Sequence, residues 1–408
     1  MNFLFAWRYF KSKKSTNAIN IIAWISVVAI TVGTAALIVV LSVFNGFEDL
    51  VKGLYGDFYA DAKIAPAKGK LLTIDSTQLA RIKNVNGVIQ YSLVAEEKAL
   101  LKNAENQTTV IAKGVDEYFN SVNKVSQHII RGNFETGTLN APQIVMGAGI
   151  ENATAIYIEQ NLEAATLYLP NKKATSLNNL NDAFNSYNVT ASGTFLIQQE
   201  FDNKYIFTNL PFMKFMLDMA PNQYSYIELK LQAKNDAAAE KITTQLQQML
   251  GNNYVVLTRY QQNKSLYSIM RMEKWIIYGI LSLILVVAAF NMIGALTMLV
   301  LEKQKDIAIL QAMGACNQKI QHIFLSSGLI LAAVGSFCGL AIASLICWLQ
   351  VKFHLLKLGA GSFVVDYYPV KLQVNDFVLV ITTIFIIAFI AAYFPARKAG
   401  KQAFSLKS

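Results

Sequence analysis

Four long runs without a charged residue constrain what this chain can fold into more than any other feature. The runs cover residues 15–47, 275–301, 323–351 and 377–396. A helix needs roughly 20 apolar residues to cross the hydrocarbon core of a bilayer, so each run is long enough to span a membrane. A mean hydropathy of +0.35 with only 15% charged residues fits that interpretation. We therefore predict an α-helical membrane protein with four transmembrane helices.

The positions of the basic residues predict the orientation of these helices. Of the formal net charge of +10, residues 1–18 carry +4 and residues 395–408 carry +4, while residues 302–322 hold three basic and two acidic side chains. Four crossings put these three pieces on one side of the membrane, and an excess of Lys and Arg marks that side as cytoplasmic. The basicity therefore reflects topology and argues against nucleic-acid binding.

The predicted segments follow from this orientation. They are a cytoplasmic amphipathic N-terminal helix (1–18), transmembrane helix 1 (19–47), a large extracytoplasmic α+β domain (48–274), transmembrane helix 2 (275–301), a cytoplasmic loop (302–322), transmembrane helix 3 (323–351), an extracytoplasmic loop (352–376), transmembrane helix 4 (377–396) and a cytoplasmic tail (397–408). The N-terminal helix would lie on the inner leaflet, because Phe3, Leu4, Trp7 and Phe10 fall near one of its faces.

The segment between the first two runs has the patterning of a folded domain. Its β-branched or alternating stretches predict strands, and "DAAAEKITTQLQQMLG" predicts a helix with Asp236 as its N-cap and Gly251 at its end. The predicted strands lie within 108–115, 188–197, 224–232 and 253–260. The segment is long enough for its own core, which two lobes could share.

No residue pattern predicts catalysis or a metal site on this chain. His128, His322 and His354 lie in different segments without ligand spacing. The stretch "GNFETGTL" at 132–139 has the glycine spacing of a phosphate loop but lacks the lysine that neutralises phosphates, so a turn between strands is expected instead. The segment 48–274 contains no cysteine, which excludes a disulfide framework there.

Glycines and prolines predict how the membrane helices pack. Gly335, Gly339 and Ala343 follow one face of the third run, where a second helix can approach closely. That helix could belong to the same chain or to another subunit. Pro395 stands at the end of the fourth run, where a missing N–H is least costly, so the spans are expected to be regular.

The cytoplasmic loop contains a short amphipathic stretch, "VLEKQKDIAILQAMGA". At 100° per residue its apolar side and its charged front turn separate. The apolar side contains Ile307, Leu310 and Met313 with Gly314 on the flank, and the front turn contains Glu302, Lys303, Lys305 and Asp306. A stripe too short to bury itself needs either the membrane surface or a groove on another protein.

Three stretches carry a resemblance to a known family. "LEKQKDIAILQAMGA" is similar to the cytoplasmic loop of FtsX-like ABC-transporter permeases. "AWRYFKSKKS" leading to "LSVFNGFEDL" resembles the frame of the first helix in lipoprotein-releasing (Lol-type) permeases, and "YFPARKAGKQ" resembles the family's C-terminal ending. Within the outer segment, "IYIEQN" stands where relatives carry a glycine turn, so that part of the resemblance is weaker.

The resemblance implies a function and a set of partners. The loop would be a coupling helix that docks on a separate cytoplasmic Lol-type ABC ATPase, which binds ATP and Mg²⁺, so this chain would be a non-catalytic subunit without a cofactor of its own. Ile307, Leu310, Met313 and Gly314 would face the ATPase, with Glu302, Lys303 and Asp306 at the rim. A second permease subunit, identical or related, would complete the membrane unit. Lipoproteins would pass from the inner membrane to a periplasmic carrier.

A lipoprotein-releasing role also implies an apolar cavity open to the outer leaflet. Apolar residues at the outer ends of the first two spans are candidates, namely Val40, Val43, Phe44, Phe47, Ile276, Ile277 and Leu281. Positions that face lipid would have the same composition. Two other functions have the same membrane architecture: an FtsX-like or MacB-like permease for efflux or cell-wall regulation, and a membrane sensor, which would need an inner signalling domain.

Overall fold

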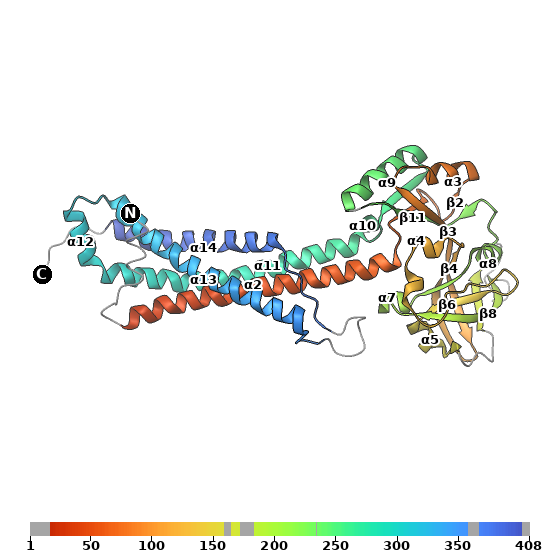
Figure 1. The fold of residues 1–408 in the computed structure, drawn as a ribbon, viewed down its shortest axis with the longest axis horizontal. Coiled ribbons are helices and arrows are strands. Elements are labelled where there is room, and N and C mark those ends of the chain that lie inside the picture. The colour runs from red at the N-terminus through yellow and green to blue at the C-terminus, as the bar shows by residue number, and fades with distance from the viewer. Residues whose placement is uncertain (1–16, 159–164, 172–182, 234, 358–366, 402–408) are drawn as a thin grey trace. The chain divides into compact units, whose positions relative to one another are not determined.

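The chain divides into a helical bundle and an α+β domain (Figure 1). The computed structural model describes residues 17–158, 165–171, 183–233, 235–357 and 367–401. The bundle contains the described residues up to Leu50, those from Ser268 to residue 357, and those from Tyr367 onward, while Val51–Tyr267 form the α+β domain. Residues 1–16, which are nearly all of the predicted N-terminal helix, and the last seven residues of the chain lie outside the described residues.

The bundle is built from four long helices and one short one, and each long helix extends past the uncharged run that predicted it. Each long helix is also apolar enough to cross a membrane. The helices are α2 (Asn17–Phe58), α11 (Lys264–Glu302), α12 (Gln304–Ala312), α13 (Asn317–Phe353) and α14 (Val374–Gly400). Helix α2 continues beyond residue 47, where the first transmembrane helix was predicted to end, to Phe58.

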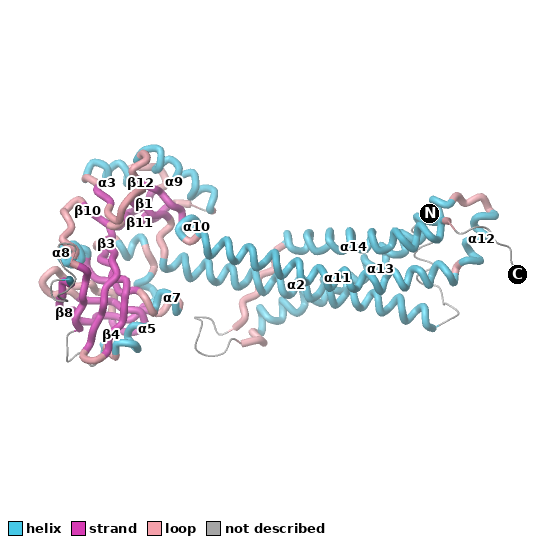
Figure 2. The backbone as a smooth tube through the Cα atoms, turned by 180° about the vertical axis from the view of Figure 1, so that it is seen from behind, coloured by secondary structure: helices cyan, strands magenta, loops and turns pink. Residues whose placement is uncertain are grey.

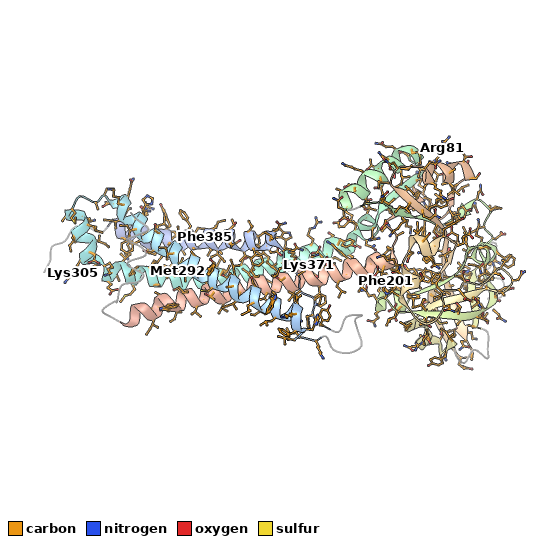
Figure 3. All side chains as sticks on the ribbon, in the orientation of Figure 1. Arg81, Phe201, Met292, Lys305, Lys371 and Phe385 are labelled. Carbon is orange, nitrogen blue, oxygen red and sulfur yellow. The ribbon has the colours of Figure 1, made fainter. Side chains whose placement is uncertain are left out.

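The bundle core is apolar and the outside of the bundle is apolar too. Leu37 and Met292 are fully buried in one cluster contributed by all five helices, whereas Phe385 on α14 remains 37% exposed (Figure 3). On α11, Leu283 and Phe290 are more than 60% exposed and lie on one stripe with spacing i, i+7. A helix that is apolar on both its inner and its outer faces is typical of a membrane span.

Proline positions in the bundle differ from the prediction at one residue. Pro395 lies inside α14, which continues to Gly400, rather than closing the helix. Its missing N–H removes one backbone hydrogen bond, but the flanking turns stay helical because Ala391, Ala396 and Ala399 are buried against neighbouring helices. The expectation that Pro395 stands at the end of the fourth membrane helix was therefore wrong.

The α+β domain contains a ten-stranded mixed sheet (Figure 2). Its strand order is β12-β1-β11-β3-β4-β9-β6-β8-β5, with β7 pairing both β3 and β8; β4 with β9 and β6 with β8 run parallel. The strands are β1 (Ala62–Pro66), β3 (Val88–Asn103), β4 (Asn106–Val115), β5 (Ile129–Gly132), β6 (Gln143–Gly147), β7 (Ala165–Pro170), β8 (Phe184–Phe195), β9 (Tyr205–Asn209), β11 (Tyr226–Leu231) and β12 (Tyr254–Thr258), while β2 (Leu72–Thr73) and β10 (Gln223–Tyr224) form a separate pair. Each predicted strand stretch overlaps one of these strands.

Short helices flank the sheet and enclose two cores, one around Ile64 and Leu246 and the other around Ile144 and Phe212. The helices are α3 (Ser76–Lys83), α4 (Phe119–Val122), the 3₁₀ helix η1 (Val125–His128), α5 (Ala148–Thr154), α7 (Gln199–Asp202), α8 (Leu210–Met216), α9 (Asp236–Leu250) and α10 (Arg259–Gln262).

The local predictions in this domain hold with one change. Helix α9 ends at Gly251, whose φ of +77° suits glycine, but its N-cap is Asn235, whose side chain accepts a hydrogen bond from the Ala238 N–H. Asp236 is instead the first residue of the helix. The stretch "GNFETGTL" connects β5 to β6 as a turn in which Gly132 and Gly137 have positive φ.

Candidate functional site

Helix α12 is the short amphipathic helix predicted in the cytoplasmic loop. Helix α11 ends at Glu302, α12 begins at Gln304, and Lys303 forms an ion pair of 3.1 Å with Asp306 across the first turn. The C-terminal end closes at Gly314, whose φ of +89° is a left-handed conformation that favours glycine. The N–H groups of Gly314 and Ala315 then donate to the carbonyl groups of Gln311 and Leu310, at 2.9 Å each.

The exposed face of α12 differs from the predicted apolar side. Ile307 is only 3% exposed and belongs to the bundle core, while Ile309 is 59% exposed and Met313 79% exposed. Successive residues of a helix are about 100° apart, so Ile309 and Met313 share one face and Ile307 lies nearly opposite. Leu310 falls between the two faces and is half-buried. We therefore reassign Ile307 from the exposed face to the attachment of α12 to the bundle.

The charged residues assigned to the rim of this face also differ in exposure. Lys305 is exposed on α12 one turn before Ile309 (Figure 3). Glu302, Lys303 and Asp306 are half-buried, and Gly314 is exposed. The exposed face of α12 therefore consists of Lys305, Ile309, Ala312 and Met313. We call this set the α12 face.

The predicted small-residue face of α13 packs against α2 of the same chain. A Cβ added at Gly339 would lie 2.6 Å from the carbonyl oxygen of Thr31, and one at Gly335 would lie 2.9 Å from the Ile30 side chain. The Thr31 hydroxyl donates a 3.1 Å hydrogen bond to the carbonyl group of Gly335, and Ala343 is fully buried. The helix that approaches this small-residue face is therefore α2 of the same chain.

Three polar residues that the prediction did not include meet where the uncharged run of α2 ends and those of α11 and α14 begin. The Asn45 amide donates to the Asp376 carboxylate at 2.5 Å and accepts from the Lys274 ammonium group at 2.8 Å, and Lys274 lies 3.2 Å from the other oxygen of Asp376. Asn45 is 1% exposed and Asp376 8% exposed. This polar triad therefore connects three helices through desolvated, charge-assisted hydrogen bonds.

The segment before α14 lies along the same part of α2. The Lys371 N–H donates to the carbonyl group of Ser42 at 2.9 Å, and the Tyr368 ring packs edge-on against Phe47 at 5.9 Å. A Cβ at Gly46 would collide with the backbone of Pro369. This close approach explains why glycine follows Asn45 in the stretch "SVFNGF".

The residues proposed to line an apolar cavity lie beside the polar triad but do not all share one environment. Contacts of Gly33 with Leu285 and of Asn45 with Lys274 show that α2 and α11 run antiparallel here. The four α2 positions (Val40, Val43, Phe44 and Phe47) lie half-buried on one side of the helix, at the spacing i, i+3, i+4 and i+7. On α11, Leu281 packs against the bundle core and Ile277 is half-buried. Ile276 is 52% exposed and lies on the exposed stripe that contains Leu283 and Phe290.

The comparisons with known proteins agree on the class of this chain. A family model described as "MacB-like periplasmic core domain" matches residues 23–249, and one described as "FtsX-like permease C-terminal" matches residues 278–404.

Curated relatives match over nearly the whole chain. The chain is 26% identical over 416 residues to the lipoprotein-releasing system transmembrane protein LolC of Neisseria meningitidis, covering 97% of this chain and 96% of that protein. It is 24% identical over 422 residues to the lipoprotein-releasing system transmembrane protein LolE of Haemophilus influenzae, covering 98% and 97%. Among solved structures, the periplasmic region of MacB from Actinobacillus actinomycetemcomitans matches with a TM-score of 0.37 at 11% identity, covering 54% of this chain and 98% of that one.

Proposed function

We propose that this chain, which belongs to the family with a MacB-like periplasmic core domain and carries an FtsX-like permease domain, is the membrane subunit of an ATP-driven lipoprotein transporter. The transporter would extract lipoproteins from the inner membrane and pass them to a periplasmic carrier. The observation that supports this most directly is the full-length similarity to proteins named as lipoprotein-releasing system transmembrane proteins. The chain would lie in the inner membrane with both termini in the cytoplasm and the α+β domain in the periplasm.

The α12 face is the proposed docking site for a separate cytoplasmic ATPase, which would bind ATP and Mg²⁺. Ile309 and Met313 are large apolar side chains one turn apart and more than half exposed, and such residues are typical anchors in a groove. Lys305 would contribute a charge at the rim that sets the register of docking. Ile307, on the opposite side of α12, is buried in the bundle, so movement of α12 would be passed to the core of the bundle.

Helix α2 offers a continuous path from the bundle to the α+β domain. It is one helix of 42 residues, and its last turns from Val51 onward belong to the α+β domain. There, the Phe58 ring stacks on Phe201 with centroids 4.0 Å apart, and the Tyr55 hydroxyl donates to Glu200 at 2.5 Å. These contacts fix the last turns of α2 within the α+β domain.

The apolar residues at the outer ends of α2 and α11 remain the proposed contact surface for lipoprotein acyl chains. The four α2 residues from Val40 to Phe47 present one half-buried face, which an acyl chain could cover at little desolvation cost. Ile276 on the exposed stripe of α11 would meet either lipid or a second permease subunit. That second subunit would be identical or related to this chain.

Depletion of this protein in its own cell tests the cargo. We expect outer-membrane lipoproteins to accumulate in the inner membrane, measured by membrane fractionation and mass spectrometry. An unchanged lipoprotein distribution, together with a loss of drug export or of cell-wall cleavage, would assign the chain to the efflux or cell-wall branch of the permeases.

Substitutions on α12 test docking separately from cargo. Ile309→Asp and Met313→Asp should each abolish co-purification of the ATPase, because each puts a charge in an apolar contact. Gln318→Asp is the matched control, since it adds the same charge to an exposed position of the same loop. Retained co-purification in both face variants would exclude the α12 face as the docking site.

A further inference from the structure

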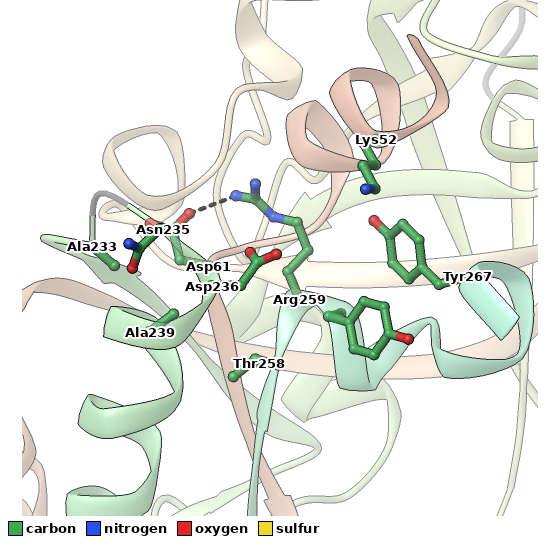
Figure 4. Close-up of a pocket in the computed structure, with 10 residues that line it drawn as sticks. Lys52, Asp61, Ala233, Asn235, Asp236, Ala239, Thr258, Arg259 and Tyr267 are labelled. Carbon is green, nitrogen blue, oxygen red and sulfur yellow. Dashed lines mark hydrogen bonds and ion pairs between the residues drawn. The ribbon is translucent and has the colours of Figure 1, made fainter. Parts of the chain in front are cut away.

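Cationic side chains are paired differently in the two units of the chain. In the α+β domain, a pocket of about 230 Å³ contains Arg259, whose Nη2 donates to Asp61 at 2.5 Å (Figure 4). Asp61 also lies 3.5 Å from the Lys230 ammonium group. At the end of α13, by contrast, Lys352 and Lys357 form no ion pair with any residue that the structure describes. These two lysines are available to an anionic partner.

Large apolar side chains are exposed on the connection between α13 and α14. The described parts of this connection, with the helix ends beside it, are residues 352–357 and 367–374, which we call the first and second arms. The exposed apolar residues of the arms are Phe353, Leu355, Leu356, Tyr368, Leu372 and Val374. Leu355, Leu356 and Val374 are each more than 60% exposed. Because apolar surface is unfavourable in water, this group of side chains requires an apolar partner.

The backbone of the first arm is paired within the protein. The Gln350 amide oxygen accepts from the Leu356 N–H at 2.9 Å, and its amide nitrogen donates to the carbonyl groups of Leu356 at 3.1 Å and Tyr368 at 3.2 Å. The Tyr368 N–H donates to the same Leu356 carbonyl group at 3.1 Å. Non-helical backbone is tolerated at membrane depth only where its polar groups are satisfied inside the protein. Leu356 meets this condition without water.

Contacts with α2 place the second arm at the level where the uncharged run of α2 ends. The Tyr368 ring packs against Phe47, the last residue of that run, and the Lys371 N–H donates to the carbonyl group of Ser42 at 2.9 Å. Ser42 precedes Phe47 by five residues, which is about 7.5 Å of helical rise into the uncharged run. The uncharged run of α13 ends at Val351, directly before the first arm. Both arms therefore lie at the edge of the predicted hydrocarbon core.

The charges beside the arms suit lipid phosphate groups. The Lys352 ammonium group lies 4.9 Å from the centroid of the Trp348 ring, and both residue types are typical of the headgroup layer. The sequence contains no acidic residue from 307 to 365. Asp49 and Asp376, which lie beside the second arm, each pair with a lysine. A bilayer surface offers phosphate groups and acyl chains at neighbouring depths, which matches cations next to exposed apolar side chains.

We propose that the two arms form a lipid-binding site at the surface of the outer leaflet. The six apolar side chains enter the boundary between acyl chains and headgroups, and Lys352 and Lys357 bind lipid phosphates. A docked protein could also cover apolar side chains, but the level of the arms along α2 and α13 favours lipid. The site rests on the proposed placement of the bundle in the membrane and is independent of the cargo, so an altered cargo would leave the lipid contacts unchanged.

Tryptophan fluorescence of the full-length chain in nanodiscs tests the lipid contact. Leu356→Trp adds a fluorophore at an exposed position, and the parent chain supplies the background of the native tryptophans. We expect phospholipids brominated in the upper acyl chain to quench the added fluorescence, and acrylamide dissolved in the water to have little effect. Met249→Trp is the matched control, because Met249 is an exposed apolar residue of α9 outside the bundle; acrylamide alone should quench it.

Two results of this experiment would overturn the proposal. Quenching of Leu356→Trp by acrylamide alone, as in the control, would place the first arm in water. Quenching by neither reagent would show that protein covers the arm, whether another copy of this chain or another part of the same one.

The same reporter tests the two lysines. In nanodiscs of phosphatidylcholine, a small fraction of brominated phosphatidylglycerol should quench Leu356→Trp more than the same fraction of brominated phosphatidylcholine. One lysine near an anionic surface enriches anionic lipid about fivefold, so adding Lys352→Gln and Lys357→Gln should remove the difference. Lys68→Gln with Lys241→Gln is the control pair, since both are exposed lysines outside the bundle. An unchanged difference in the Lys352→Gln, Lys357→Gln variant would overturn the role of these lysines in binding phosphate.

Discussion

Lys274→Met is the substitution that tests most directly how the outer end of the bundle is held together. It removes the ammonium group that lies 3.2 Å from Asp376 and 2.8 Å from the Asn45 amide oxygen, and it keeps an unbranched apolar side chain of similar length. The Asp376 carboxylate, 8% exposed, would then keep only the Asn45 amide as a side-chain donor within the triad. A desolvated negative charge would thus be left without its counter-charge.

The expected cost follows from the burial of each partner. Breaking a fully buried ion pair by removing one partner costs about 3–5 kcal/mol. The Lys274 side chain is 24% exposed, so solvent screening lowers the cost, and we expect about 2–3 kcal/mol. At 2–4 °C per kcal/mol, this corresponds to a decrease in Tm of roughly 4–12 °C.

The charge-swapped pair Lys274→Asp with Asp376→Lys separates electrostatics from packing. The Asn45 amide has a donor end and an acceptor end, so a rotation of the amide plane by half a turn suits the reversed polarity. The double variant should therefore be more stable than either single charge reversal, with a coupling energy of at least about 1 kcal/mol.

Thermal unfolding of the purified chain in one detergent, followed by tryptophan fluorescence, measures these differences. Lys371→Met is the matched control, because Lys371 pairs with Asp49 at 2.6 Å but both side chains are about half exposed. Such surface pairs contribute about 0–1 kcal/mol. The reasoning would be refuted if Lys274→Met destabilised the chain no more than Lys371→Met, or if the swapped pair were no better than the single reversals.

Three further predictions concern other parts of the chain. Gly339→Leu should force α2 and α13 apart and lower the stability of the bundle by about 1–3 kcal/mol, whereas Gly294→Ala, in open space, should be neutral or stabilising; equal Tm values would contradict this. Lys113→Met should destabilise the α+β domain by about 3–5 kcal/mol, because Lys113 and Glu228 form an ion pair of 2.6 Å with both side chains at most 3% exposed. Adding Glu228→Gln should recover part of that loss in chemical denaturation, and no recovery would argue against an unpaired charge as the cause. Burial raises the pKa of Asp202 to about 6, so the folded state binds its proton more tightly and loses stability as the pH rises from about 4 to about 6. The stability advantage of Asp202→Asn over the parent should therefore grow across that interval in paired thermal unfolding, and a constant difference would rule out this titration.

The membrane helices could be predicted because their signal is local. Length without charge is sufficient to identify a candidate span, and a long helix contains the described residues of each uncharged run. Strand stretches such as 108–115 were equally visible in the sequence, because β-branched alternation is also a local pattern. The order of the strands in the sheet was not visible in the sequence. Strand β3 pairs with both β11 and β7, and no local periodicity encodes pairing between strands so far apart in the sequence.

The exposed side of α12 could not be derived from its own sequence. Ile307 and Ile309 have the same side chain and lie two positions apart, yet one is 3% exposed and the other 59%. Which side of a short helix is buried depends on the neighbouring helices. A helical-wheel plot orders the residues around the axis but does not identify the side that faces the bundle.

The polar triad had a signal in the sequence that the prediction did not use. Asn45 is a polar residue inside the first uncharged run, and Lys274 and Asp376 are the charged residues that immediately precede the second and fourth runs. Polar groups at such positions are costly unless they pair with one another. A search for partners of Asn45 among the charges that flank the runs would have included both residues, although not the hydrogen bonds that join them.

Helix α12 and the polar triad together indicate how a movement at one end of the bundle could reach the other. Ile307 is attached to the bundle core on one side of α12, while Ile309 is exposed on the opposite side, so a partner could bind α12 without displacing its attachment. At the other end, Asn45 and Lys274 connect α2 to α11 within a few residues of the α+β domain. Between these points both helices are continuous and packed in one core, and close-packed cores transmit displacement rather than absorb it. A force on α12 would therefore be expected to move α2 and α11 together at the polar triad.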